Sequence, residues 1–192
     1  VDYWDYIGWK DPFAQAAFAS RQRDAVRRQR GQVAYTPQIL VDGAGASIWA
    51  SPARVEVALA KAAARPPRAR LSVRAESAGE VLNIELGIQP AGLIAPDVLA
   101  FIALTESRLE SKVVAGENRG RTLRHDHVVR ELSGPITLAP IPPGVREMVV
   151  RKSIVMPRAW KRQDLAVSAF LQDTRSGEFL QAVRLPACGD AG

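Results

Sequence analysis

Cysteine is almost absent from this sequence of 192 residues, which contains one, Cys188. A single cysteine makes no internal disulfide and no cysteine-rich zinc site, so a disulfide scaffold and a zinc finger are excluded. Long apolar runs are also missing: the longest stretch without a charged residue, 132–145, contains four prolines. Because a membrane-spanning helix needs about 20 apolar residues, we expect no membrane span.

Aromatic residues are few, at 6%, whereas 47% of the residues are hydrophobic and 24% are charged. These fractions are ordinary for a globular protein and argue against disorder. The length suits one or two domains and is sufficient to bury a core without disulfides or metals.

The net charge of +6 raises the question of a nucleic-acid partner. Residues 1–67 and 68–192 each carry an excess of three positive charges, so neither part is strongly basic. The densest basic cluster is Arg21, Arg23, Arg27, Arg28 and Arg30. At 100° per residue Arg23, Arg27 and Arg30 share one helix side, which we interpret as a solvated face. Stacking aromatics and a groove-reading element are missing beside it, so we expect no nucleic-acid partner.

The first 65 residues alternate between helical and extended patterns. Asp11 suits an N-cap and Pro12 a first helical position, which predicts a helix from there to Gln29, before Gly31. The stretch 33–41 is extended and contains Pro37.

A tight turn follows at 42–45, with glycines suited to positive φ, and then a returning strand over 46–50. Ser51 and Pro52 predict the start of a second helix. The apolar spacing i, i+3, i+4, i+7 supports this helix, at Val55, Ala58, Leu59 and Ala62.

Beyond the Arg65-Pro66-Pro67-Arg68 segment the apolar period changes from 3.6 to 2. Alternation around 71–75 and 82–88 indicates strands, and the nearly continuous apolar run 98–105 indicates a strand buried on both faces. Further strands are expected near 108–114, 124–132, 146–155, 165–173 and 178–185. So many short strands with regular turns are typical of an all-β sandwich.

Six runs of residues, spread over nearly the whole chain, carry a family resemblance. They are VDYWDYIGWKDPF (1–13), RQR (21–23), YTPQ (35–38), GENRG (116–120), HDHVVR (125–130) and FLQD (170–173). In these runs the chain resembles a family of uncharacterised secreted bacterial proteins with a thioredoxin-like domain. The segment 33–64 also looks like the second half of a thioredoxin fold.

The resemblance and the strand pattern together give the expected fold class, α/β plus all-β. We expect an incomplete thioredoxin-like domain at 1–65, a linker at 66–68, an immunoglobulin-like β-sandwich at 69–186 and a tail at 187–192. The resemblance implies a periplasmic or secreted location. It also implies a first strand and a Cys-x-x-Cys helix upstream of Val1, on the same polypeptide or on a second chain.

Pro37 matches the position at which thioredoxin-like proteins place a cis-proline beside their redox cysteines. A cis X–Pro bond costs only about 0.5–1 kcal/mol and lets the backbone of Thr36 pair with an extended peptide. We therefore expect the substrate-binding residues to be Trp4, Asp5, Tyr35, Thr36 and Pro37. The aromatic rings of Trp4, Tyr6 and Trp9 could equally seal the core, and Asp5 could accept a proton from a buried thiol.

Two histidines, His125 and His127, would point to one face of a regular strand, as at the beginning of a metal site. Nothing in the sequence places a third ligand, although Glu117 and Glu131 are conceivable, so we expect no metal and no other cofactor.

Three hypotheses remain from the sequence. The first is a thiol–disulfide redox protein whose cysteines lie upstream of this chain, which alone would not be active. The second is a non-catalytic binding or structural module of the cell envelope with a protein or peptide partner. The third is a metal-dependent enzyme that uses His125 and His127. Cys188 is expected to be a free thiol of the tail.

Overall fold

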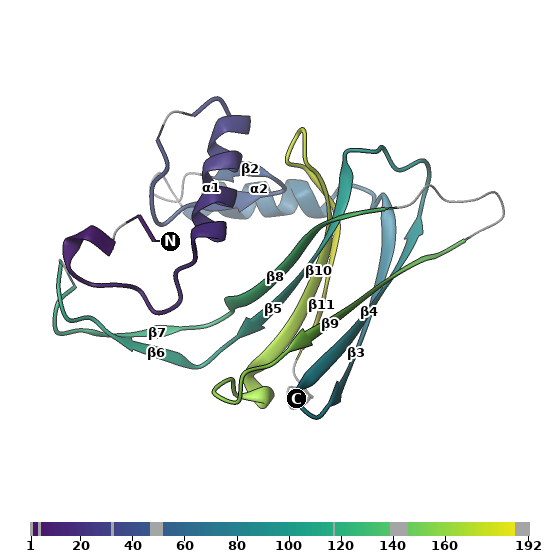
Figure 1. Cartoon of the computed structure of the whole chain (residues 1–192). Helices are drawn as coiled ribbons and strands as arrows, with labels where there is room; N and C mark the ends of the chain where they lie inside the picture. Colours follow the sequence, from purple (N-terminus) through teal and green to yellow (C-terminus); the bar gives the residue numbers. More distant parts are fainter. Residues whose placement is uncertain are drawn as a thin grey trace.

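Two antiparallel sheets form most of the C-terminal part of the chain (Figure 1). The computed structural model describes residues 2–3, 5–31, 33–46, 52–116, 118–138 and 146–186. One sheet has the strand order β3-β4-β9 and the other the order β11-β10-β5-β8. Their strands are β3 (Ala69–Ala78), β4 (Val81–Pro90), β5 (Val98–Glu106), β8 (Val128–Thr137), β9 (Met148–Val155), β10 (Leu165–Asp173) and β11 (Phe179–Leu185).

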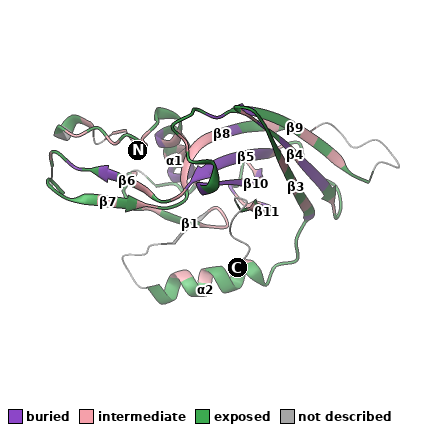
Figure 2. Cartoon of the chain, turned by 90° about the horizontal axis from the view of Figure 1, so that it is seen from below, coloured by how far each residue is buried: buried purple, intermediate pink, exposed green. Residues whose placement is uncertain are grey.

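The main core lies between these two sheets. Alternate residues of β4, such as Ile84, Leu86 and Ile88, pack in one cluster with alternate residues of β5, such as Ile102 and Leu104. Since successive side chains of a strand point to opposite faces, Phe101 and Ala103 point the other way, yet they are also buried. The expectation that 98–105 is covered on both faces is therefore confirmed, and Figure 2 shows β5 and β10 mostly buried.

The second face of the four-stranded sheet is covered by the N-terminal part of the chain. Its elements are η1 (Asp5–Ile7), α1 (Ala16–Arg28), β1 (Ile39–Val41), β2 (Ala44–Ala46) and α2 (Pro52–Ala63). Helix α1 packs on this face, whereas α2 contacts the β1–β2 hairpin and is largely exposed (Figure 2). No helix in the described part of the chain is long and apolar enough to cross a membrane.

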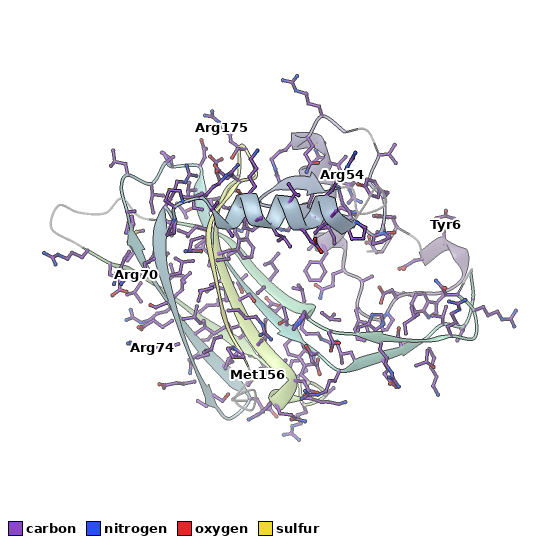
Figure 3. The ribbon with its side chains drawn as sticks, turned by 180° about the vertical axis from the view of Figure 1, so that it is seen from behind. Tyr6, Arg54, Arg70, Arg74, Met156 and Arg175 are labelled. Atoms are coloured by element: carbon purple, nitrogen blue, oxygen red, sulfur yellow. The ribbon has the colours of Figure 1, made fainter. Side chains whose placement is uncertain are left out.

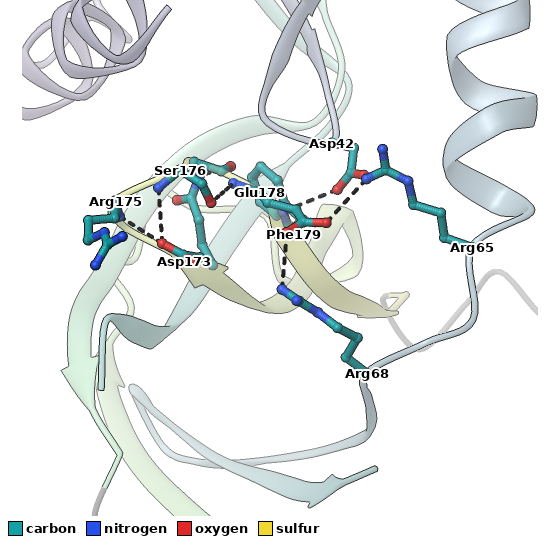
Figure 4. A network of polar contacts seen from close by, with 10 residues as sticks. Asp42, Arg65, Arg68, Asp173, Arg175, Ser176, Glu178 and Phe179 are labelled. Atoms are coloured by element: carbon teal, nitrogen blue, oxygen red, sulfur yellow. Dashed lines mark hydrogen bonds and ion pairs between the residues drawn. The ribbon is translucent and has the colours of Figure 1, made fainter. Parts of the chain in front are cut away.

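The β1–β2 hairpin meets the β10–β11 turn in close backbone contact (Figure 4). Asp42 and Gly43 form the two-residue turn, with φ of 52° and 77°. The Asp42 carboxylate accepts a hydrogen bond from the Phe179 N–H and pairs with Arg65. Arg65 and Arg68 both pair with Glu178, at 3.2 and 3.1 Å. Arg65, directly before the predicted linker 66–68, and Arg68, its last residue, are thus both held to the same turn of the C-terminal sheet.

Three local expectations need correction. Helix α1 begins at Ala16 and not at Pro12, because Asp11 accepts the Phe13 N–H in a separate turn and the backbone at Gln15 is extended. Within 33–41 only Ile39–Val41 forms a strand. The returning strand starts earlier than predicted, at Ala44, so the turn is Asp42-Gly43 alone; residues 47–51 lie outside the described part.

The predicted strand 124–132 is two strands. β7 (Thr122–His125) pairs with β6 (Leu109–Lys112), and β8 begins at Val128. The chain turns at Asp126 and His127, and the φ of His127 is 56°. Asp126 stabilises this turn by accepting the backbone N–H of Arg108 at 2.9 Å. The β6–β7 ribbon extends away from the two sheets, next to the N-terminal segment (Figure 1).

Candidate functional site

Tyr35, Thr36 and Pro37 form the approach to β1, opposite one face of α1. The Thr36–Pro37 peptide bond is cis, as expected from the sequence. A second cis bond, at Gly134–Pro135 in β8, was not expected.

Gln22 of α1 connects this approach to the beginning of the chain. Its amide nitrogen donates to the carbonyl oxygen of Tyr35 at 2.8 Å and to the side-chain oxygen of Gln38 at 3.0 Å. Its amide oxygen accepts a hydrogen bond from the Tyr3 hydroxyl at 2.8 Å. One side chain therefore sets the spacing between the helix, the Thr36–Pro37 segment and the N-terminal aromatic segment.

A cavity of about 350 Å³ lies between α1, the Thr36–Pro37 segment and the end of β10. Polar side chains from three places in the sequence line it, together with apolar ones such as Phe18 and Leu40. The polar residues are Arg21, Gln22, Arg28, Thr36, Gln38 and Gln172. No aspartate or glutamate is among the described residues that line this cavity.

Arg21 is the most strongly held cation of the cavity. Its Nη2 donates to the Gln172 side-chain oxygen at 2.6 Å, and its guanidinium carbon lies 4.6 Å from the ring centroid of Phe101 and 5.4 Å from that of Phe170. Burial lowers the pKa of Arg21, the nearby Arg28 lowers it further, and Asp24 opposes the shift. Because an arginine pKa lies far above neutrality, the side chain stays charged.

Gln172 fixes the orientation of Arg21. Its side chain is buried, and its amide nitrogen donates to the carbonyl oxygen of Gly177 at 2.8 Å. The amide oxygen is therefore turned toward Arg21. Since a guanidinium has five N–H donors in a fixed fork, the bond to Gln172 leaves further donors for a ligand in the cavity.

The other predicted site residues are only partly brought together with this cavity. Asp5 lies in η1 and does not line it, and Trp4 lies outside the described residues. The Trp9 indole N–H donates to the carbonyl oxygen of Lys112 in β6, so the N-terminal segment around Trp9 lies beside the β6–β7 ribbon. Tyr6, which is 78% exposed, lies at the edge of the molecule (Figure 3).

His125 and His127 do not share a strand face, which corrects the basis of the metal hypothesis. His125 ends β7 and makes a 2.7 Å hydrogen bond with the hydroxyl of Ser111, whereas His127 stands in the following turn within 3.4 Å of the Ser107 hydroxyl. Within the described part of the chain, no group of three or more potential ligands could hold a metal ion. Glu117 lies outside that part.

Three larger cavities are present among the described residues. One of about 410 Å³ is lined by residues of β3, β4 and β9 and contains none of the predicted site residues. Another, of about 520 Å³, lies on the other side of Arg21, beside Phe13 and His125. The third, of about 680 Å³, lies between the two sheets and contains none of the predicted site residues. Its walls include Leu82 and Met156, which belong to the main core. The polar 350 Å³ cavity is therefore the better candidate site despite its smaller volume.

Arg21 and Arg28 were missed as site residues because the basic cluster was interpreted as one solvated face. The cluster divides between two faces: Arg23 and Arg27 are exposed, whereas Arg21 and Arg28 are half-buried. The signal was the spacing of Phe18, Arg21, Ala25 and Arg28, which places both arginines on the apolar side of the helix. Gln172 had no comparable local signal.

The fold and the cavity define a β-rich protein in which two helices accompany antiparallel sheets, with a polar cavity where a helix meets a sheet. The chain belongs to the family described as "Protein of unknown function (DUF1223)", which matches residues 1–172. The comparison with curated proteins found no match.

Three solved structures are similar. "HBP35 of Porphyromonas gingivalis" has a TM-score of 0.70 and 14% identity, with 97% of this chain covered and 65% of that one. A protein from Agrobacterium tumefaciens has a TM-score of 0.60 and 19% identity, with 100% and 80% covered. A domain of the outer membrane lipoprotein Omp28 from Porphyromonas gingivalis has a TM-score of 0.40 and 13% identity, with 64% and 89% covered. The first two show a shared fold, and the chain spans about two thirds of the HBP35 structure.

Proposed function

We propose that this chain is part of an envelope or secreted protein that binds an extended segment of polypeptide in the cavity beside Thr36 and Pro37. In this proposal residues 1–65 are a thioredoxin-like unit and residues 69–186 an immunoglobulin-like sandwich. The observation that carries the proposal is the cavity of about 350 Å³ whose wall includes Thr36 and Gln38 opposite Gln22 and Arg21.

The chemistry of the wall suits a peptide. Hydroxyl, amide and guanidinium groups offer hydrogen bonds to a peptide backbone, while Phe18, Leu40 and Phe179 offer apolar contact to a side chain. Gln22 and Gln172 are both held by hydrogen bonds within the protein. Gln22 uses both of its N–H groups in these bonds and so fixes the shape of the wall, whereas Gln172 orients Arg21, whose remaining N–H donors are free for a ligand. These donors are positioned before a ligand arrives, which lowers the entropic cost of binding.

Titration with short peptides tests the proposal. The probes are acetylated and amidated pentapeptides Gly-Gly-Xaa-Gly-Gly with a varied central residue, and calorimetry or NMR measures their dissociation constants. Gln38→Ala removes one hydrogen-bonding group from the wall and should weaken binding about threefold to tenfold. The matched control Gln89→Ala changes an exposed glutamine of β4 and should leave binding unchanged. Equal binding by wild type and Gln38→Ala would contradict the proposal that the peptide binds in this cavity.

A thiol–disulfide reaction is the second candidate function. What favours it is the position of Thr36-Pro37 directly before β1 and its hairpin, where the resemblance places the partner of a Cys-x-x-Cys. In such a reaction two protein thiols would become a disulfide while a disulfide of the bound polypeptide is reduced to two thiols. The only cysteine in this chain is Cys188, outside the described part, so both reacting cysteines would come from upstream.

Thiol counting on the full-length gene product decides between the two candidates. The protein is alkylated before and after reduction, and its intact mass is measured. Two upstream cysteines that react only after reduction would support the redox function. A product with no cysteine besides Cys188 would exclude it and leave the binding function.

A further inference from the structure

Two arginines of the cavity, Arg21 and Arg28, make no ion pair with any carboxylate of the described residues. The ion pairs among the described residues include Arg27 with Asp24, but none that involves Arg21 or Arg28. Most arginines of the chain lie in solvent, where a missing partner costs little, whereas Arg21 and Arg28 are half-buried between α1 and the sheet. Asp24 raises the pKa of Arg21, but its carboxylate pairs with Arg27 and does not line the cavity. A partly buried guanidinium that makes no ion pair within the cavity is a place where a ligand can supply the carboxylate.

The two guanidinium groups also increase the positive potential of the same space. Arg21 and Arg28 are two helical turns apart on one face of α1, and both line the 350 Å³ cavity. Arg28 is close enough to Arg21 to lower its pKa. Arg28 also lies over the β10–β11 turn, since a Cβ added at Gly177 would come within 2.9 Å of its Nε. Both groups thus project from α1 toward the same part of the sheet, Arg21 toward Gln172 of β10 and Arg28 toward Gly177 of the following turn.

From this geometry we infer that the cavity recognises a carboxylate of the bound polypeptide, with Arg21 as its principal partner and Arg28 as the second. A carboxylate is planar and fits the guanidinium fork. The apolar wall beside the arginines suits the methylene groups that carry a side-chain carboxylate. The source is either an acidic side chain or the C-terminus of the polypeptide. This inference rests on the proposed function and specifies its ligand.

Four pentapeptides test the inference. Two are capped at both ends, with Glu or Gln in the centre; the third has Gln in the centre and a free C-terminal carboxylate; the fourth is capped with phosphoserine in the centre. For the wild type, at least one carboxylate peptide should bind about tenfold or more tightly than the capped Gln peptide, because a charge-assisted hydrogen bond is stronger than a neutral one. Whichever peptide gains identifies the source of the carboxylate.

Three variants assign this preference to the cavity. Arg21→Gln should abolish it, Arg28→Gln should reduce it, and Arg23→Gln, which changes an exposed arginine on the other side of α1, should leave it unchanged. Since Arg21 packs against Phe101, circular dichroism confirms the fold of each variant, and Arg28→Gln provides an independent test if Arg21→Gln does not fold.

The failures are distinguishable. Equal binding of all four peptides would overturn the inference and leave the proposed function in place. A carboxylate preference that persists in both Arg21→Gln and Arg28→Gln, or a clear preference for the phosphoserine peptide over both carboxylate peptides, would also overturn it. Absence of binding by every peptide would refute the proposed function and the inference together.

Discussion

Gly43 is the position where a single methyl group should separate the N-terminal hairpin from the C-terminal sheet. A Cβ at Gly43 would lie 2.0 Å from the carbonyl oxygen of Gly177 and 3.0 Å from the backbone nitrogen of Glu178. The obstacle is backbone, which cannot rotate away as a side chain can. Gly43→Ala therefore requires the two turns to move apart.

The cost has two parts. The φ of Gly43 is 77°, and a non-glycine residue in this left-handed region costs about 1–2 kcal/mol. Overpacking against a fixed neighbour adds about 1–3 kcal/mol. The sum predicts a loss of about 2–5 kcal/mol in the free energy of unfolding. A loss of this size would also weaken the contacts of Asp42 with Phe179 and Arg65, which join the same two turns (Figure 4).

Gly79→Ala is the matched control. Gly79 has a similar φ of 62° but no atom within 4 Å of its added Cβ, so it should incur the backbone cost alone. Urea unfolding of wild type and both variants measures the difference. If Gly43→Ala and Gly79→Ala are destabilised equally, the close contact between the two turns is not present and the reasoning is refuted.

Two further predictions concern charged groups. Arg130→Ala should lower the free energy of unfolding in urea by about 3–5 kcal/mol, because Glu106, whose side chain is 1% exposed, would lose its ion-pair partner. A decrease below about 1 kcal/mol in the free energy of unfolding would contradict this prediction. The backbone N–H groups of Ser176 and Arg175 hold the pKa of Asp173 below its ordinary value. The ionised carboxylate therefore stabilises the fold at any pH above that ordinary value. This stabilisation is lost as the pH falls through the lowered pKa. Asp173→Asn should therefore reduce the acid sensitivity of unfolding below about pH 4, and an unchanged pH profile would contradict it.

Much of the fold could be predicted from the sequence because its signals are local. The run 98–105 becomes β5, Pro52 opens α2, and the glycine at 43 forms a hairpin turn. The start of α1 could not be predicted in the same way. Gln15 donates to the carbonyl oxygen of Arg130, and this contact with a distant strand competes with the local capping signal of Asp11.

The candidate site depends even more on distant contacts. Thr36 and Pro37 could be proposed from the sequence because the stretch that carries the family resemblance around them is short and continuous. The pairing of Arg21 with Gln172 joins residues 151 positions apart, and no periodicity within α1 or β10 indicates it. The charge and shape of the cavity therefore depend on how the helix packs against the sheet, which no local sequence pattern indicates.

Hydrogen exchange is the most direct test of the central claim that ligand binds between α1, the Thr36–Pro37 segment and the end of β10. The exchange of backbone amides is compared by mass spectrometry with and without a saturating concentration of the capped Glu pentapeptide. The account predicts slower exchange in residues 18–28 and 36–40, and weaker protection of the same segments in Arg21→Gln at a peptide concentration that just saturates the wild type. Protection confined to other segments, such as those around the cavity between the two sheets, would contradict it.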